Sequence, residues 1–249
     1  MAEWNDPRTT GVNTTATVGV PRAARDAGLR SYMLSVYNYM ASGVLLTGIV
    51  ALGFANSSLI NLIVNPATGQ ATPLLWVALF APLGLVMWLN YGINRISLGA
   101  AQALFWVYAG LIGVQFSTLF LVYTGGSVAQ AFFAAAASFL GMSLWGYTTK
   151  KDLSGFGTFL IMGVVGLFVA LLISIFMHSA ALDLAISLIG VLIFAGLTAY
   201  RTQQIKSIYF VVAGNGEAMG KSAVIGALSL YIAFINMFLF LLRLFGNRR

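Results

Sequence analysis

Acidic side chains inside apolar segments are the usual carriers of proton and cation chemistry in membranes. This sequence has six acidic residues in 249, and none lies deep inside an apolar stretch. Three are in the N-terminal tail, two are in loops, and one is near the edge of an apolar segment. They are Glu3, Asp6, Asp26, Asp152, Glu217 and Asp183. A membrane protein of this kind must work without a buried carboxylate, or has lost one.

The nucleophiles and bases of this chain do not form a catalytic set. Ser143 is a candidate nucleophile, and His178 is the single histidine that could activate it. The predicted helices place Ser143 near the cytoplasmic end of one span and His178 in a short outer loop. One histidine and no cysteine also argue against a zinc site. We therefore expect no enzymatic activity and no cofactor.

Residues 214–222 come close to a phosphate-binding loop. The motif requires a glycine five positions before Gly-Lys-Ser, and Asn215 occupies that position. The helix that follows would be a membrane span, and no parallel sheet can precede it. We interpret the segment as a glycine-rich cytoplasmic turn that leads into a basic helix start.

Three polar side chains, Gln102, Gln115 and Asn236, interrupt apolar segments. Two interpretations remain open: hydrogen bonds between helices, or the lining of a pore. Asn236 is the best pore candidate because its neighbours are wholly apolar, and Gln115 is the second. Arg201, at the end of the sixth apolar stretch, fits an arginine that extends to the inner membrane interface.

The composition predicts an all-α integral membrane protein. Hydrophobic residues make up 59% of the chain and charged residues 8%, whereas soluble domains carry roughly 25% charged residues. The lipid bilayer is therefore the expected surrounding. The net charge of +7 comes from basic residues spread over loops and tails. Because a nucleic-acid surface gathers them on one face, no nucleic-acid partner is expected.

Seven apolar stretches are long enough to cross a bilayer as helices. The second is the weakest, because Pro82 and Asn90 interrupt it. The loops are short, so we predict a flexible cytoplasmic tail over residues 1–30 and one membrane domain over 31–249. The predicted spans cover about 32–55, 73–90, 100–123, 128–147, 155–177, 181–200 and 223–245.

Lysine and arginine alternate between loops in a way that places the N-terminus in the cytoplasm. The C-terminus conflicts with this rule, because a seventh full span would carry Arg243, Arg248 and Arg249 to the outer side. Either the last segment spans in spite of these charges, or it is re-entrant. We favour spanning, because a few charges at the end of a final helix are weak evidence.

Four segments resemble the Bax inhibitor-1 family, also called the transmembrane Bax inhibitor motif family, in its bacterial YccA-like branch. Together they run from the tail to the C-terminus, and the last two are the most specific. They are residues 25–33 (RDAGLRSYM), 150–154 (KKDLS), 189–206 (IGVLIFAGLTAYRTQQIK) and 228–246 (LSLYIAFINMFLFLLRLFG).

The resemblance implies seven helices, six of which surround a central C-terminal one, in a bacterial inner membrane. It also implies a calcium leak that responds to pH through two aspartates, one on each of the last two segments. Two neighbouring carboxylates can share a proton and titrate near neutral pH. This chain has Arg201 and Ala233 at those positions, so the family's pH sensor is not expected here.

Two functions follow as expectations. The first is regulation through protein contacts, for example with a membrane-anchored AAA protease, a role associated with YccA-like members. The second is a leak of calcium or another ion along Asn236 and Gln115.

Overall fold

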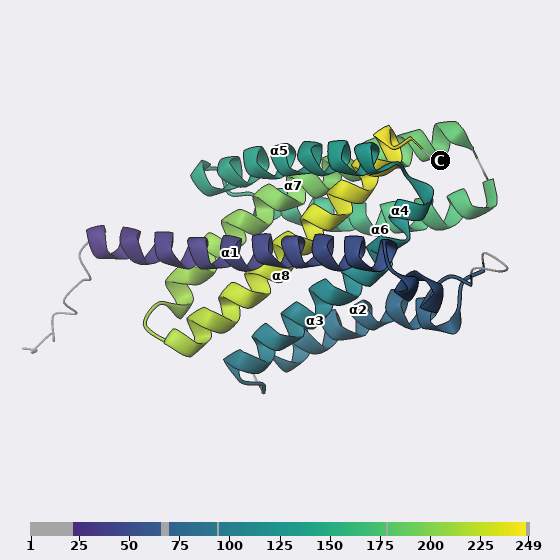
Figure 1. The fold of residues 1–249 in the computed structure, drawn as a ribbon. Coiled ribbons are helices and arrows are strands. Elements are labelled where there is room, and N and C mark those ends of the chain that lie inside the picture. Colours follow the sequence, from purple (N-terminus) through teal and green to yellow (C-terminus); the bar gives the residue numbers. More distant parts are fainter. Residues whose placement is uncertain (1–21, 66–69, 94, 178, 248–249) are drawn as a thin grey trace, which may run out of the picture.

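The computed structural model describes residues 22–65, 70–93, 95–177 and 179–247, and these residues are almost entirely helical (Figure 1). Seven helical segments in this part are long and apolar enough to cross a membrane, which confirms the predicted all-α membrane fold. The elements are α1 (Arg22–Ala55), η2 (Ser58–Leu62), α2 (Pro73–Gly92), α3 (Leu98–Ser117), α4 (Leu119–Val122), α5 (Gly125–Thr148), α6 (Ser154–Met177), α7 (Ala180–Val212) and α8 (Gly216–Phe245). The short α4 continues α3, and together they form the third span.

Local sequence sets several helix starts. The Asn215 side chain accepts a hydrogen bond from the Ala218 backbone N–H at 3.0 Å and caps α8. Ser97 caps α3 in the same way, through Ala100. Pro73 opens α2, where its missing N–H costs nothing. Pro82 lies inside α2 without ending the helix, so the weakest predicted span is nevertheless helical throughout.

Three helices extend beyond their apolar stretches. α1 begins at Arg22, so residues 22–30, which the sequence assigned to the tail, are helical. α7 continues to Val212 and α8 begins at Gly216. The 33 residues of α7 correspond to a length of about 50 Å. A hydrocarbon core of about 30 Å covers only part of this length. A prediction from apolar composition therefore underestimates the length of the helix.

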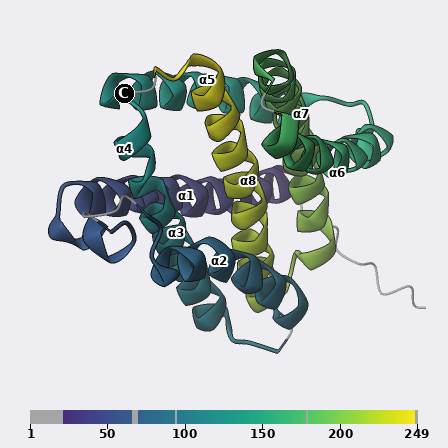
Figure 2. The ribbon, with the colours of Figure 1, turned by 90° about the vertical axis from the view of Figure 1, so that its right-hand side faces the viewer.

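α8 lies at the centre of the bundle (Figure 2). Of its most apolar window, 72% is buried, against 11% to 39% in the other six spans. It packs directly on α1, α3, α5 and α7, while α2 packs mainly on α3 and α6 mainly on α7. The prediction of a central C-terminal helix is confirmed. α8 is one continuous helix of 30 residues and is long and apolar enough to cross a membrane, as the favoured prediction of a full span requires.

A buried hydroxyl pair ties α8 to its neighbours. The Tyr231 hydroxyl of α8 lies 2.6 Å from Thr47 Oγ1 of α1, and Thr47 also donates to the Ala109 carbonyl of α3 at 2.9 Å. Tyr231 is fully buried. Hydrogen bonds between helices hold membrane bundles where apolar contact alone gives little preference over lipid.

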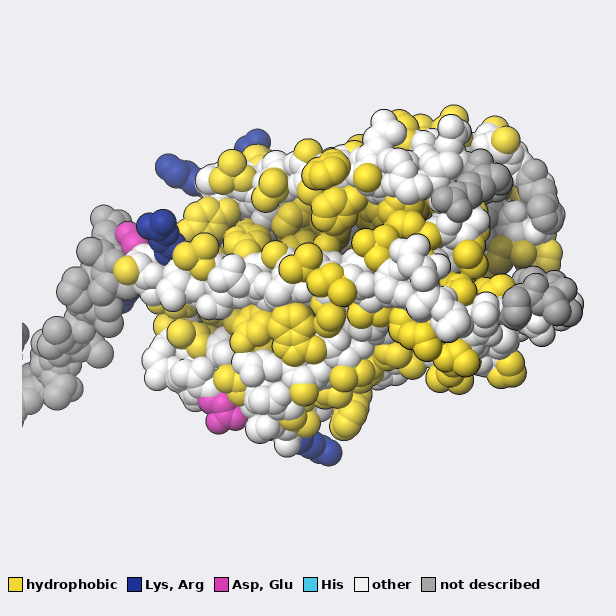
Figure 3. Space-filling view, viewed as in Figure 1, with side chains coloured by type: hydrophobic (Ala, Val, Ile, Leu, Met, Phe, Trp, Pro, Cys, Tyr) yellow, Lys and Arg dark blue, Asp and Glu magenta, His cyan; other side chains and the backbone are white. Residues whose placement is uncertain are grey.

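Charged side chains mark one end of the bundle, which we call the basic end. It holds the α5–α6 loop with Lys150 and Lys151, the α2–α3 loop with Arg95, and the α7–α8 turn. On the face shown in Figure 3, charged side chains lie at the left-hand and lower rim, and the wide middle is free of them. This end is the predicted cytoplasmic one; the orientation itself stays a prediction.

Candidate functional site

The two positions at which the family resemblance implies aspartates line the same cavity. Arg201 of α7 and Ala233 of α8 are both in its wall, with α2 and α6 closing the sides. The cavity has a volume of about 580 Å³. We call it the arginine cavity. Its polar wall is made by Asn90, Arg201, Gln204, Ser222 and Ser229.

Arg201 is half-buried and is held against its own helix. Its Nη1 donates a hydrogen bond to Gln204 Oε1 at 2.7 Å, and its guanidinium carbon lies 5.6 Å from the centre of the Tyr200 ring. Ala233 is buried. The arrangement puts a fixed positive charge and a methyl group where a carboxylate pair would otherwise face the same space.

The polar side chains proposed for a pore have other partners. Gln115 of α3 donates to the Ala78 carbonyl of α2 at 2.5 Å, and Gln102 donates to the Tyr39 hydroxyl of α1 at 2.6 Å. Both contacts are hydrogen bonds between helices. Asn236 donates to Ile232 O of its own helix at 2.8 Å. Neither Asn236 nor Gln115 is in the wall of the arginine cavity, and pore lining stays a prediction.

Ser143, the candidate nucleophile, is buried between α1 and α7. Its hydroxyl lies 2.6 Å from the Tyr37 hydroxyl and 3.0 Å from Thr202 Oγ1. His178 lies outside the described residues. The hydroxyl chain joins three helices, which is a structural use of this serine.

The glycine-rich segment 214–222 forms a turn and a capped helix start. Gly214 has a φ of +101°, a conformation that glycine adopts without strain. Lys221 pairs with Glu217 at 2.8 Å, one turn apart on α8. Helix α7, and not a strand, precedes the turn, which agrees with the interpretation as a glycine-rich turn that leads into a helix.

Asp152 organises the start of α6 at the basic end. Its carboxylate accepts hydrogen bonds from the Ser154 hydroxyl at 2.7 Å and from the Ser154 backbone N–H at 2.9 Å. These two bonds, the hydroxyl first, lower the pKa of the exposed Asp152 carboxyl. The residue therefore carries its charge near neutral pH, where it complements the positive end of the helix.

A crevice runs between α1 and α5 along most of the bundle. Two cavities of about 700 Å³ and about 360 Å³ follow one another in it, and Val44, Phe132 and Phe234 line both. Phe234 belongs to α8, so the central helix forms the floor. In Figure 3 the hollow between α5 above and α1 below is filled with yellow side chains.

The outer side of α1 carries polar residues beside this crevice. Ser31, Ser35 and Asn38 are exposed, and Ser42 is half-buried. Their spacing of four, three and four residues places them along one face of the helix. The hydroxyls of Ser35 and Ser42 donate hydrogen bonds to backbone carbonyls of their own helix. The side-chain amide of Asn38 makes no hydrogen bond to any residue that the structure describes. We call this set the α1 polar stripe.

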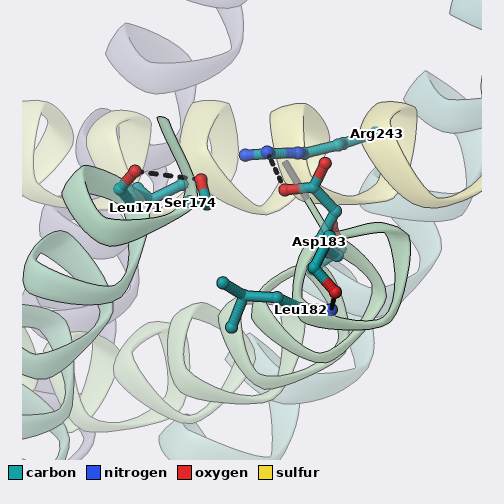
Figure 4. Close-up of polar contacts among 7 residues, drawn as sticks. Leu171, Ser174, Leu182, Asp183 and Arg243 are labelled. Atoms are coloured by element: carbon teal, nitrogen blue, oxygen red, sulfur yellow. Dashed lines mark hydrogen bonds and ion pairs between the residues drawn. The ribbon is translucent and has the colours of Figure 1, made fainter. Parts of the chain in front are cut away.

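The end of the bundle opposite the basic end holds one ion pair. Arg243 of α8 points at Asp183 in the first turn of α7, with Nη2 2.5 Å from Oδ1 (Figure 4). Both side chains are partly exposed. The pair gives Arg243 a counter-ion at the end where the sequence rule expects few basic residues. The sequence could have predicted this ion pair. Asp183 is in the first turn of α7 and Arg243 is in the last turn of α8, and these two ends lie side by side because consecutive helices are antiparallel.

Replacing Arg243 by glutamine is expected to lower the free energy of unfolding by about 1 kcal/mol, because the pair is only partly shielded from water. Thermal unfolding in detergent at low and high salt measures the change. Asp183→Asn should have an effect of similar size, and the double variant should not be worse than either single one. Additive losses in the double variant would show that the two residues do not act as a pair.

Metal ligands do not gather anywhere in the described chain: no group of three His, Cys, Asp or Glu side chains occurs within residues 22–247 as far as the structure covers them. The arrangement of a central C-terminal helix, an arginine cavity and a polar-faced first helix therefore defines a multi-pass helical membrane protein without a recognisable metal centre in this part.

Comparison with known proteins identifies the family. Residues 29–249 match the family model described as inhibitor of apoptosis-promoting Bax1. The chain is 47% identical over 224 residues to a protein of Rickettsia prowazekii, covering 90% of this chain and 92% of that one. It is 43% identical to the inner membrane protein YbhL of Escherichia coli, covering 90% and 94%. The chain belongs to the Bax inhibitor-1 family, as the sequence segments indicated.

Proposed function

We propose that this chain is a regulatory protein of the bacterial inner membrane that acts by binding another membrane protein. A membrane-anchored AAA protease is the partner that the family resemblance suggests. The observation that carries the proposal is the α1 polar stripe, which is largely exposed within a helix long and apolar enough to cross a membrane. The N-terminal tail is a further candidate contact, and its residues 1–21 lie outside the described part of the chain.

Exposure of the α1 polar stripe to lipid alone would be unfavourable in free energy. Asn38 lies eight residues beyond Arg30 along α1, or about 12 Å, which places it inside the hydrocarbon region when Arg30 is at the interface. Its amide would have no hydrogen-bond partner in lipid, and each unsatisfied polar group there costs several kcal/mol. A polar side chain on a second helix would satisfy it.

The spacing of the stripe suits a helix as the partner. Positions that repeat at four and three residues form the seam of two helices that cross at a shallow angle. Serines on the seam let the backbones approach closely. Ser35, Asn38 and Ser42 also line a hollow of about 650 Å³ beside Trp106 of α3, which gives room for larger side chains of the partner.

The crevice extends the contact surface around α1. Ala41 lines both this hollow and the crevice between α1 and α5. Because the crevice continues past Val44 into the other half of the bundle, its length matches a transmembrane helix better than the acyl chain of a single leaflet. A partner on α1 could therefore use both of its sides.

Ion conduction is the alternative, and the arginine cavity opposes it for cations. Arg201 repels a calcium ion, and the repulsion is strong where water does not screen it. Gln115 and Asn236 each donate a side-chain amide N–H to a backbone carbonyl in the hydrogen bonds described above. A leak along these residues stays a separate prediction.

Crosslinking in the membrane tests the proposal, because the chain has no cysteine and one can be placed at will. A Ser35→Cys variant is expected to form an adduct with a second membrane protein through a lipid-soluble bifunctional reagent, and mass spectrometry then identifies the adduct. Asn38→Leu in the same variant should lower the yield about three- to sixteenfold, because a hydrogen bond between membrane helices contributes roughly 0.6 to 1.7 kcal/mol.

The matched control is Met162→Cys, which is 68% exposed on a different helix, α6. It should give little adduct. Equal yields from both cysteines, or a yield that Asn38→Leu does not change, would contradict binding through the stripe. An adduct that contains only two copies of this chain would contradict the regulation of another protein.

A further inference from the structure

The arginine cavity contains a positive charge that no described side chain neutralises. The ion pairs in the described part of the chain join Lys221 to Glu217 and Arg243 to Asp183. Neither involves Arg201, and the cavity wall contains no Asp or Glu. A guanidinium has five N–H donors, of which the Gln204 side chain takes one. The cavity therefore attracts an anion.

The polarity of the wall changes along the membrane direction. Asn90, Gln204 and Ser222 lie toward the basic end, as the directions of α2, α7 and α8 require. Phe194 and Ile232 lie deeper, and their side chains are apolar. Such a wall fits a molecule with a charged head and an apolar chain better than a small inorganic ion.

Arg201 lies close to the α5–α6 loop at the basic end. Two residues further along α7, the Gln203 amide donates to the Lys151 carbonyl, and its oxygen accepts from the Leu153 backbone N–H. Those residues form the loop at the basic end, outside the membrane span. An anionic group beside Arg201 would thus remain near the interface while its chain extends between α2 and α6.

We propose that the arginine cavity binds an anionic amphiphile, with its phosphate or carboxylate on Arg201 and its chain against Phe194 and Ile232. The Asn90 amide supplies a second donor, because its bond to the Val86 carbonyl uses one of its two N–H groups. The replacement of a carboxylate pair by Arg201 and Ala233 thereby turns a cation-attracting space into an anion-binding one.

Ligand-dependent thermal stability of the full chain in a neutral detergent tests this site. Short-chain phosphatidylglycerol is expected to stabilise the protein, and phosphatidylcholine of the same chain length much less. Arg201→Gln should weaken phosphatidylglycerol binding about tenfold or more, because charge-assisted hydrogen bonds to phosphate are lost. The control is Arg95→Gln, which removes an exposed charge at the same end of the bundle and should leave binding unchanged.

A comparison with inorganic phosphate distinguishes a lipid head group from a free phosphate ion as the anion that binds. Stabilisation by phosphatidylglycerol alone supports the amphiphile, whereas equal stabilisation by inorganic phosphate would overturn the role of the chain. Ser229→Leu narrows the cavity and keeps Arg201, so it should weaken phosphatidylglycerol binding even if Arg201→Gln does not fold. Equal phosphatidylglycerol binding by the wild type and by whichever of these two variants folds would overturn the proposal.

Discussion

Gly146→Ala is expected to lower the free energy of unfolding by about 3 kcal/mol, at the upper end of what overpacking by small side chains costs. Gly146 of α5 packs on the backbone of α7. A Cβ atom at this position would lie 2.7 Å from Ala199 Cα and 2.8 Å from its carbonyl carbon. Because backbone atoms cannot turn aside as a side chain can, the two helices would have to separate.

Thermal unfolding of the purified protein in detergent measures this loss. Gly141→Ala on the same helix is the matched control, since no atom beyond its own stretch of helix lies within 4 Å of the Cβ that it adds. The control should be neutral or slightly stabilising, because alanine favours the helix more than glycine does. Equal stability of the two variants would show that α5 and α7 are not held together at Gly146.

The sequence predicted the seven spans but not which glycines bring helices together. Gly43 and Gly48 lie in the same apolar stretch, and the sequence does not distinguish them. A Cβ at Gly43 would meet the Phe105 ring at 2.7 Å, whereas none of the surrounding atoms lies within 4 Å of one at Gly48. The two differ in which face of α1 they occupy, and apolar composition does not determine that face when lipid and protein interior are equally apolar.

The charges were more informative than the apolar residues. Arg243 conflicted with the rule that places basic residues on the cytoplasmic side, and the structure gives this arginine a counter-ion, Asp183. Few helix ends in this chain carry a charged residue. An ion pair can therefore be predicted by looking for opposite charges at the neighbouring ends of two antiparallel helices. The α1 polar stripe could be found in the same way, because Asn38 and its serines recur at helical spacing within an apolar segment.

The arginine cavity lay beyond what spacing alone can predict. Thirty-two positions separate Arg201 from Ala233, and neither residue type indicates a shared site. Only the resemblance to the Bax inhibitor-1 family connected them, and the structure places both in one wall. The cavity exists because α2 and α6 pack on α3 and α7 rather than on each other, which no local pattern encodes.

Arg201→Asp combined with Ala233→Asp is expected to create a proton-dependent cation path, the largest functional change that we predict for this chain. Both positions line the arginine cavity, so the change removes the fixed positive charge and gives two carboxylates access to one space. Carboxylates that share a site cannot both ionise freely. Their charge, and with it the attraction for calcium, should then depend on pH.

Calcium flux into liposomes that contain the purified protein measures this, at acidic and at neutral pH. The double aspartate variant should change its flux about fivefold or more over this range, as the charge of the shared site changes. The matched control is Arg201→Asn with Ala233→Asn, which has nearly the same size but no titratable group. The wild type and this control should show no such dependence.

A double aspartate variant that folds normally, yet has the same flux and spectra at both pH values, would show that these positions do not form a joint site. Flux of the wild type that rises with proton concentration would instead contradict the proposal that this chain acts through protein contacts.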